Sequence, residues 1–466
     1  MWYYCDEGYL KGVFLMKLRK ISAVLTAGCL LFACAGCSSD NPWGAATSGQ
    51  DPDHIEISLP EMQQETEPVA ETSAETEPEP TQAEPNGETY ILFTSDILCG
   101  ADRGFGYAGL AQIRHNLEAN GYNTILVDGG NALQGEPIGT FTEGGAITDI
   151  MNAAGYDVAV PAERDLDYGA ERFAELELLS DFQYVCCNYP EDDAEFDPYA
   201  VISAGDTDIA FIGVMNDENA EASVQTSMEE IYEAGAGLVY VIGHAGAGDA
   251  QVVVFDAEGA ETARIGIAPR FSNIGYSHIS ADGQVLETGV WTWDEDMSMP
   301  DLLGIDNEVS AVVADKTAEL DEILDEVVAV NEGEDIESSF GDFCAEALRD
   351  QTGADIALLA SDAVYASIGT TYVTYRDLVD AFPDCRGVCI LEVTGQQLLD
   401  LTETEEDEPL FLMSPSDFDI EPGETYTVAC TDAGIFEQST VISGYVMPDY
   451  EALINYITVT LEGVIS

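Results

Sequence analysis

Short apolar runs alternate with helix-like stretches from residue 89 to residue 466, and this alternation restricts the fold more than any other feature. The runs at 90–93 and 123–127 are apolar, whereas the stretch at 109–119 between them has a helical pattern. Alternating strand and helix patterns predict an α/β fold built from layers. Because residues 89–466 exceed what one hydrophobic core usually serves, we expect two domains there.

The N-terminal segment has the organisation of a secretory signal. Basic residues at 17–20 precede an apolar run at 21–35, which ends in small residues just before Cys37. This run is shorter than the about 20 apolar residues that a membrane-spanning helix needs, so a signal is favoured over a spanning helix. We therefore predict a lipoprotein signal at residues 1–37 with lipidation at Cys37. Cys34 is a weaker competing site, and a buried apolar helix is the structural alternative.

This signal predicts an extracytoplasmic protein, anchored to the membrane at the bacterial cell surface. The predicted partner is the membrane itself, which the chain reaches through its N-terminal lipid anchor. Met16 opens a more typical signal sequence than Met1 does, so a start at Met16 is an alternative.

The next segment, residues 38–88, is acidic and poor in apolar side chains. It contains thirteen Asp or Glu residues and no Lys or Arg, in a sequence rich in Thr, Pro and Ala. Such a segment cannot bury enough apolar surface to fold. We predict an extended, disordered linker between the lipid anchor and the folded part of the chain.

The acid excess continues through the folded part. Residues 89–466 contain 74 Asp or Glu residues against 10 Lys or Arg, and Lys316 is the only lysine among them. Nucleic acid and anionic membrane surfaces are therefore excluded as preferred partners. We interpret the excess as adaptation to salt or to a cation-rich cell envelope, with a dedicated cation-binding role as the alternative.

Seven cysteines fall in the folded part, so they cannot all pair within one chain. Cys385 and Cys389 flank Arg386-Gly387, and a small loop closed between them is one pairing that the spacing allows. No spacing typical of a zinc ribbon occurs. The other cysteines are predicted to be buried apolar thiols.

Two groups of motifs occur in the order and spacing of a known family. The first group includes ILFTSDILCG at 91–100, LVDGGNALQGEP at 126–137, and shorter segments at 106–111, 151–157 and 166–169. These resemble the metallophosphatase domain of 5′-nucleotidases. The second group includes TGADIAL at 352–358, LEVTGQQL at 391–398, and segments at 337–343 and 373–377. These are similar to the C-terminal domain of the same family.

The resemblance implies a two-domain α/β fold. Its N-terminal part, residues 89–305, is expected to form a four-layer metallophosphatase-like αββα domain. Its C-terminal part, residues 336–466, is expected to form an α+β domain of the 5′-nucleotidase type. A connecting helix is expected at 306–335.

The family hydrolyses phosphate esters with two divalent metal ions, which Asp, His and Asn side chains hold and which activate a bound hydroxide. Asp96 matches the first metal ligand, but Leu98 stands where the family has a histidine. Asn131 stands where the family has the aspartate that bridges the two ions. A neutral amide bridges two dications poorly, so the resemblance implies a damaged site.

The later metal motifs are altered as well. The family's Gly-Asn-His-Glu appears here as Ala162-Glu163-Arg164-Asp165, so a permanent cation replaces the catalytic imidazole. Of the family's last motif only His244 is retained, because Gly246 stands in place of the second histidine. No catalytic residue is therefore predicted. At most one divalent metal ion is expected, held by the remnants Asp96, Asn131, Glu163 and His244.

The nucleoside-binding motifs of the family are also eroded. Its Asn-Gly-Gly-Gly-Ile-Arg is replaced by residues 360–365, which end in Tyr365, so the substrate-binding arginine is lost. Tyr365, Phe411 and Phe436 are the candidate substrate-binding residues, since an aromatic ring can stack on a base. A core role is the structural alternative for Phe411 and Phe436.

Three functions follow from this pattern. The preferred one is a non-hydrolytic surface lipoprotein with a binding or scaffold role, whose small-molecule or protein ligand the sequence does not identify. The second is an extracytoplasmic metal-dependent hydrolase of nucleotides or other phosphate esters. The third is a structural envelope protein. The fold alone does not decide among these three functions.

The resemblance also predicts where the residues of the altered site lie in the fold. The strands before Asp96, Asn131 and His244 should end at one edge of the fold, because open α/β sheets place their sites at strand carboxyl ends. There we expect the guanidinium of Arg164 to neutralise carboxylates that metal ions balance in the family, since buried acids without a cation are costly. Its expected partners are Asp96, Glu163 or Asp165.

Overall fold

The structure is a computed structural model of the chain. It describes residues 85–189, 196–205, 207–216, 219–244, 250–293, 304–332, 340–360, 363–366, 368, 371–402, 411–415, 419–436 and 439–465. These residues all belong to one compact unit of the chain. The predicted signal with Cys37, and the predicted linker up to residue 84, lie outside the described residues. Within the described part, no helix has the length and apolarity needed to cross a membrane.

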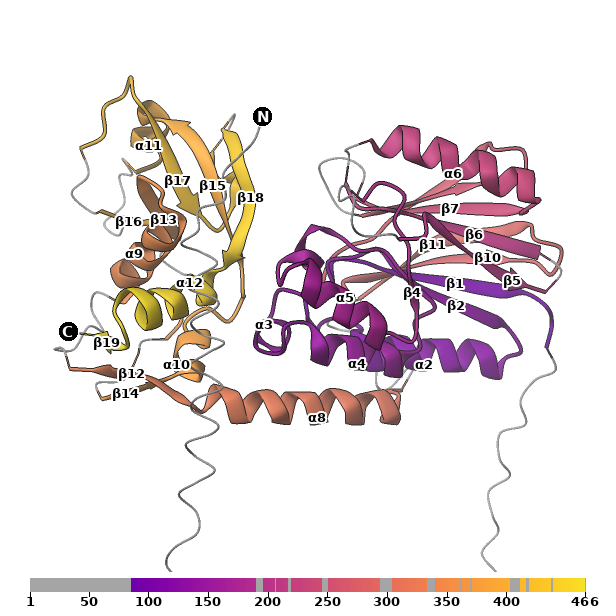
Figure 1. The fold of residues 1–466 in the computed structure, drawn as a ribbon, viewed down its shortest axis with the longest axis horizontal. Helices are drawn as coiled ribbons and strands as arrows, with labels where there is room; N and C mark the ends of the chain where they lie inside the picture. The colour runs from indigo at the N-terminus through magenta and orange to yellow at the C-terminus, as the bar shows by residue number, and fades with distance from the viewer. Residues whose placement is uncertain are drawn as a thin grey trace, which may run out of the picture. The chain divides into compact units, whose positions relative to one another are not determined.

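A six-stranded sheet forms the first layer of strands (Figure 1). Its order is β11-β10-β1-β2-β3-β4. The strands β1, β2, β3 and β4 are parallel to one another, whereas β10 and β11 extend the sheet as antiparallel strands. The bounds are β1 Thr89–Thr94, β2 Asn123–Asp128, β3 Val158–Ala159, β4 Gln183–Tyr184, β10 Asn273–Ile279 and β11 Val285–Thr292.

A five-stranded sheet forms the second layer, in the order β5-β6-β7-β8-β9. Only β6 and β7 are parallel in it. The bounds are β5 Tyr199–Ala204, β6 Thr207–Val214, β7 Leu238–Gly243, β8 Gln251–Phe255 and β9 Glu261–Gly266.

The two sheets pack face to face through a shared apolar core. Strand β1 is buried on both faces, which explains why its sequence is an almost continuous apolar run. The Phe93 ring lies 5.6 Å from that of Tyr240 on β7, and the same distance separates Tyr240 from Phe211. Across the interface the Tyr240 hydroxyl and the Ser277 hydroxyl form a hydrogen bond of 2.8 Å. This buried bond and the contact between the Phe93 and Tyr240 rings join the second sheet to the first.

Helices cover the outer faces of the two sheets. Those associated with the six-stranded sheet are α2 Gly106–Ala119, α3 Pro137–Thr142, α4 Gly145–Ala154 and α5 Ala170–Leu179. The helix α6, Ala220–Ala234, packs Ile231 against Ile212 and Val239 of the five-stranded sheet. The layers are therefore helix, sheet, sheet and helix, and the predicted four-layer αββα arrangement is confirmed.

The connecting segment contains a helix that is shorter than predicted. Helix α8, Asn307–Leu324, begins where Asp306 accepts hydrogen bonds from the backbone N–H groups of Glu308 and Val309. After Leu324 the chain forms β12, Val327–Asn331, rather than continuing as a helix to residue 335. Its three valines favour a strand, and β12 pairs with β14 and β19.

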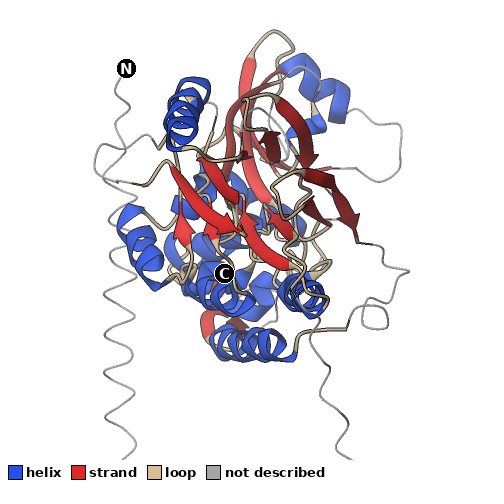
Figure 2. Cartoon of the chain, turned by 90° about the vertical axis from the view of Figure 1, so that its right-hand side faces the viewer, coloured by secondary structure: helices blue, strands red, loops and turns tan. Residues whose placement is uncertain are grey.

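The C-terminal lobe is built on a five-stranded sheet in the order β16-β13-β17-β15-β18. Helix α11 packs on one face through Leu398, and α9 and α12 lie on the other (Figure 1). Figure 2 shows the chain turned by 90°, with helices in blue and strands in red. The predicted α+β arrangement is confirmed. The bounds are β13 Ile356–Ala360, β14 Tyr372–Thr374, β15 Gly387–Thr394, β16 Phe411–Ser414, β17 Thr425–Cys430, β18 Thr440–Pro448, β19 Val464–Ile465, α9 Phe340–Thr352, α10 Tyr375–Val379, α11 Gly395–Thr402 and α12 Asp449–Asn455.

Hydrogen bonds join the C-terminal lobe to the loops of the first. The Tyr450 hydroxyl donates to the Gly135 carbonyl at 2.9 Å and accepts from the Thr140 hydroxyl at 2.7 Å. The Arg270 guanidinium donates to the carbonyls of Asp384 and Cys385 at 2.9 and 3.2 Å. Both contacts use loops at the carboxyl ends of strands, where the candidate site lies.

The bond between Tyr240 and Ser277 gives a test of the packing between the sheets. We expect Tyr240→Phe to lower the free energy of unfolding by about 1 kcal/mol or more, because the buried Ser277 hydroxyl loses its partner. The double variant Tyr240→Phe/Ser277→Ala should recover most of that loss, since neither polar group then remains. Urea unfolding of the single and double variants measures the difference. Additive losses in the double variant would show that the two hydroxyls do not interact.

Candidate functional site

The predicted metal-ligand remnants lie at the carboxyl ends of strands. Asp96 follows β1 and Asn131 follows β2, whereas His244 follows β7 of the second sheet. Glu163 opens the short 3₁₀ helix η1, Glu163–Leu166, which follows β3. The site is thus built from loops at the ends of four strands in both sheets, as expected for an open α/β fold.

The loops after β1 and β2 adopt strained backbone conformations. Asp96, Leu98, Cys99 and Asn131 all have positive φ, between 52° and 61°, although none is glycine. The two loops brace each other through backbone hydrogen bonds, from Asp96 N–H to the Gly130 carbonyl at 2.8 Å and from Leu98 N–H to the Asn131 carbonyl at 3.0 Å. Backbone strain of this kind persists only where neighbouring structure holds it, and it is concentrated at functional sites.

Asp96, Asn131 and His244 meet in one hydrogen-bonded cluster. The Asn131 side-chain nitrogen lies 2.8 Å from Asp96 Oδ1, and His244 Nε2 lies 3.0 Å from both Asp96 oxygens. Burial raises the pKa of Asp96, but the hydrogen bond and charge of His244, together with hydrogen bonds from Asn131 and Ser95, hold the pKa below the usual value. Burial likewise lowers the pKa of His244, but the hydrogen bond and charge of Asp96, together with the charges of Asp165 and Glu163, raise that pKa above its usual value. The pair therefore favours a carboxylate facing an imidazolium.

The orientation of the Asn131 amide is fixed by its second contact. Its oxygen accepts a hydrogen bond from the Arg164 backbone N–H at 3.1 Å. A backbone N–H requires an acceptor, so the amide nitrogen must point toward Asp96 and His244. Asn131 therefore presents N–H donors where a bridging carboxylate would present oxygen ligands.

A buried carboxylate, Asp165, organises these loops. It accepts three backbone hydrogen bonds of 2.8 to 2.9 Å, from Asn131, Leu133 and Ala162. Burial raises the pKa of Asp165, while these N–H donors act in the opposite direction. The three bonds hold the loop after β2 against the start of η1, and they place Asn131 beside Arg164.

Asp128, at the end of β2, is buried beneath the cluster. Its carboxyl accepts a 2.8 Å hydrogen bond from the Thr94 hydroxyl and another from the Gly130 N–H. Burial raises the pKa of Asp128 well above its usual range. Asp128 is thus engaged within the protein and does not face the cluster as a free ligand.

Arg164 does not take the place that the sequence led us to expect. Within the described residues its guanidinium forms no ion pair with Asp96, Glu163 or Asp165. It lies instead over the Tyr445 ring of the C-terminal lobe, with 4.2 Å from its central carbon to the ring centroid. The expectation of a guanidinium among the carboxylates was wrong, because His244 and backbone N–H groups already neutralise them. Stacking on an aromatic ring is the favourable alternative for a cation.

Glu163 remains at the margin of the site. Its side chain is exposed, and in the described part its carboxylate accepts no hydrogen bond from Asn131 or His244. The structure therefore brings together three of the four predicted remnants.

The donor set does not fit the two metal ions that the resemblance to 5′-nucleotidases implies. Leu98 contributes no ligand atom, and Asn131 turns an amide nitrogen toward the position that an ion would occupy. His244 Nε2 is used by Asp96, and His244 Nδ1 is buried without a hydrogen-bond partner among the described residues. Histidine ligands usually donate their second ring nitrogen to an orienting partner. Among the described residues, no group of three or more His, Cys, Asp or Glu side chains is arranged to hold a metal ion.

The predicted substrate-binding aromatics are not equivalent. Tyr365 is 63% exposed, so its ring is accessible. Phe436 is only 7% exposed and packs with Leu391 and Cys430 in the apolar core beneath α11, so in this conformation its ring is not free to stack on a ligand. The core alternative therefore describes Phe436 better. Phe411 lies on β16, opposite Ala360 of β13.

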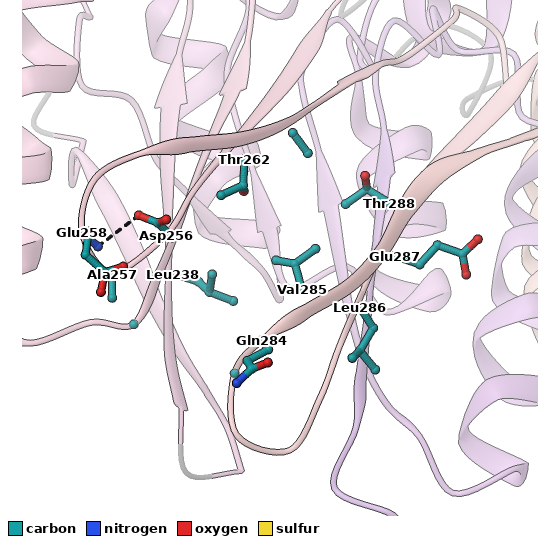
Figure 3. Close-up of a pocket in the computed structure, with 13 residues that line it drawn as sticks. Leu238, Asp256, Ala257, Glu258, Thr262, Gln284, Val285, Leu286, Glu287 and Thr288 are labelled. Atoms are coloured by element: carbon teal, nitrogen blue, oxygen red, sulfur yellow. Dashed lines mark hydrogen bonds between the residues drawn. The ribbon is translucent and has the colours of Figure 1, made fainter.

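A separate groove lies between the edge strands of the two sheets (Figure 3). It has a volume of about 570 Å³ and is lined by residues of β9, β11 and the turn after β8, including Asp256, Thr262, Val285 and Glu287. None of the predicted site residues contributes to its lining. The groove is therefore distinct from the cluster at the strand ends.

Sequence reasoning missed two residues that shape the site, Asp165 as an anchor and Tyr445 as the partner of Arg164. Asp165 had a signal, because an acidic side chain near the start of a short helix can accept the N-terminal backbone N–H. Tyr445 had none, since it lies on β18 in the other lobe and meets Arg164 only in the folded chain.

The fold and the site define a class of protein: a metallophosphatase-like αββα lobe joined to an α+β lobe, with a hydrogen-bonded cluster of Asp96, Asn131 and His244 at the strand ends. Comparison with known proteins agrees with this class. Residues 313–411 match the family model described as 5′-nucleotidase, C-terminal domain. This match covers the second half of α8 and the C-terminal lobe as far as the start of β16. No curated protein sequence matches the chain.

Solved structures show the same fold at low sequence identity. The NAD nucleotidase of Haemophilus influenzae is similar with a TM-score of 0.60 and 14% identity, over 81% of this chain and 97% of that one. A 5′-nucleotidase precursor from Thermus thermophilus has a TM-score of 0.51 and 15% identity, with the same coverage. A sulfate thiohydrolase, also from Thermus thermophilus, has a TM-score of 0.50 and 14% identity, over 82% of this chain and 96% of that one.

The anchoring role of Asp165 can be tested by its removal. We expect Asp165→Ala to lower the free energy of unfolding by about 3 kcal/mol or more, because three buried backbone N–H groups lose their acceptor. Asp167→Ala is the matched control: this exposed neighbour accepts none of these bonds, and its change should stay below about 1 kcal/mol. Urea unfolding followed by the fluorescence of Trp291 and Trp293 reports on this lobe. Equal effects of the two changes would rule out the anchor.

Proposed function

We propose that this chain is an exported lipoprotein of the 5′-nucleotidase family that binds a ligand or serves as a scaffold at the cell surface without hydrolysing phosphate esters. The observation that carries this proposal is the Asn131 amide nitrogen, which lies 2.8 Å from Asp96 and faces His244. A site for two dications needs anionic oxygen at that position. Here the position holds hydrogen-bond donors.

Charge balance supports the same proposal. In a two-metal site the carboxylates are neutralised by ions, and they remain unpaired when the ions leave. Here Asp96 has His244 as its counter-charge, and Asp165 has three backbone donors. Because a buried charge without a partner is costly, these contacts allow the loops to fold without metal ions.

A hydrolase working with one divalent ion is the competing function. It would require His244 to release Asp96 and the Asn131 amide to rotate, which would leave the Arg164 N–H without its acceptor. The known structures of this fold include an NAD nucleotidase and a sulfate thiohydrolase, so the fold serves more than one reaction. The proposal therefore rests on the side chains at the strand ends.

We expect the full chain to hydrolyse nucleoside monophosphates at no more than the background rate with manganese, zinc or cobalt added. The reason is that Leu98 and Asn131 do not supply the ligands that the chemistry needs. Phosphate release over a range of metal concentrations measures the rate. Turnover that disappears in Asp96→Ala or His244→Ala would overturn the proposal.

A repaired variant provides the positive control for that assay. It carries Leu98→His, Asn131→Asp, Glu163→Asn, Arg164→His and Gly246→His, where Gly246 lies outside the described residues. Calorimetry should show a gain in manganese affinity of at least about tenfold for this variant. A matched variant with Gln in place of His at 98 and 246 has similar bulk but weaker ligands, and should gain less. Equal affinities would mean that the ligand positions are wrongly matched.

The predicted lipid anchor at Cys37 can be tested separately. We expect the full chain, expressed in a bacterium, to enter the detergent phase on Triton X-114 partition, because an acyl chain on Cys37 supplies the apolar surface. Cys37→Ser should move the protein to the aqueous phase or retain its uncleaved signal. Cys34→Ser is the control and should remain in the detergent phase. Loss of anchoring in Cys34→Ser alone would assign the lipid to that residue instead.

A further inference from the structure

Two buried cysteines of the C-terminal lobe face each other across neighbouring strands. Cys389 on β15 is the direct antiparallel partner of Cys430 on β17. Their sulfur atoms lie 3.6 Å apart, and the residues are only 2% and 1% exposed. Both are free thiols in this structure.

We propose that Cys389 and Cys430 are a disulfide pair in the mature protein. Directly opposed residues of antiparallel strands have Cα atoms about 4.5 to 5.5 Å apart. Disulfides span Cα separations of about 4.4 to 6.8 Å, so the backbone is already in place. The sulfur atoms must approach by only about 1.5 Å to reach the bond length, which a small rotation of the two side chains provides.

The alternative pairing of Cys389 with Cys385 is disfavoured by the same strands. The Cys385 thiol lies 3.6 and 3.8 Å from the carbonyls of Phe382 and Pro383, in the loop before β15. Cys389 is the first residue of β15 to pair with β17, and its side chain lies beside Cys430 in the apolar core under α11. The strand register therefore selects Cys430 as the partner.

The reaction is an exchange with a small-molecule disulfide, such as glutathione disulfide. A Cys389 thiolate attacks one sulfur of that disulfide and releases the first small thiol. The Cys430 thiolate then attacks the Cys389 sulfur and releases the second. The two protein thiols lose two protons and two electrons in total, and the small disulfide accepts both electrons and becomes two thiols.

Burial restricts when this exchange can occur. Neither sulfur is accessible in the folded lobe. The oxidant must therefore reach the two thiols before β15 and β17 have paired during folding. Once formed, the bond closes the chain between residues 389 and 430. It thereby limits the unfolded states of the lobe, which is how a disulfide usually stabilises a protein.

The test refolds the full reduced chain in a buffer containing reduced and oxidised glutathione. Free thiols are then blocked with iodoacetamide, and the protein is digested with trypsin and a Glu-specific protease without reduction. Cleavage after Arg386 and Glu392 isolates Cys389 in peptide 387–392, and cleavage after Glu424 and Glu437 isolates Cys430 in peptide 425–437. We expect these two peptides to be found joined.

The oxidised chain should also unfold roughly 5–10 °C higher than the reduced chain. This gain should vanish in Cys389→Ala and persist in the control Cys385→Ala. Blocked thiols on both peptides, or a link from Cys389 to Cys385, would overturn the proposal. The peptide masses of the unchanged protein decide the question even if a variant fails to fold. Because refolding takes place in vitro, the outcome is independent of the proposed export.

Discussion

The candidate site depends on one buried carboxylate, that of Asp165. By accepting three backbone N–H groups it fixes the loop after β2 against the turn after β3. Because the two loops are held together, the Arg164 backbone N–H lies beside the Asn131 amide oxygen. The amide nitrogen of Asn131 therefore faces Asp96. A polar network of this kind specifies one arrangement only when each member is satisfied.

Each acidic group at the strand ends is satisfied in a different way. Asp96 faces an imidazole, Asp165 faces backbone donors, and Asp128 is held by the Thr94 hydroxyl and a backbone N–H. In a chain with this excess of acid, arginine is scarce, and Arg164 is used to join the lobes over Tyr445 rather than to balance the site. The carboxyl groups at the strand ends are thus satisfied by side chains and backbone N–H groups of the same region of the fold.

The features that local sequence determines were predicted, and those that depend on the assembled fold were not. The α/β layers and the placement of Asp96, Asn131 and His244 at strand ends follow from hydrophobic pattern and motif order. The start of α8 follows from the Asp306 cap, but its end does not, because β12 gains its stability from pairing with β14 and β19. The direction of Arg164 depends on Tyr445 in the other lobe, and the burial of Phe436 depends on packing beneath α11.

Hydrogen bonds among Asp96, Asn131 and His244 close the position at which a metal ion would be held. Crystals grown with millimolar manganese, with data collected on both sides of the manganese absorption edge, test this directly. We expect no anomalous peak within bonding distance of Asp96, and we expect the Asn131 nitrogen to remain in contact with the Asp96 carboxylate. One or two manganese peaks at about 2.1 Å from Asp96 and His244, with the Asn131 oxygen turned toward them, would contradict it.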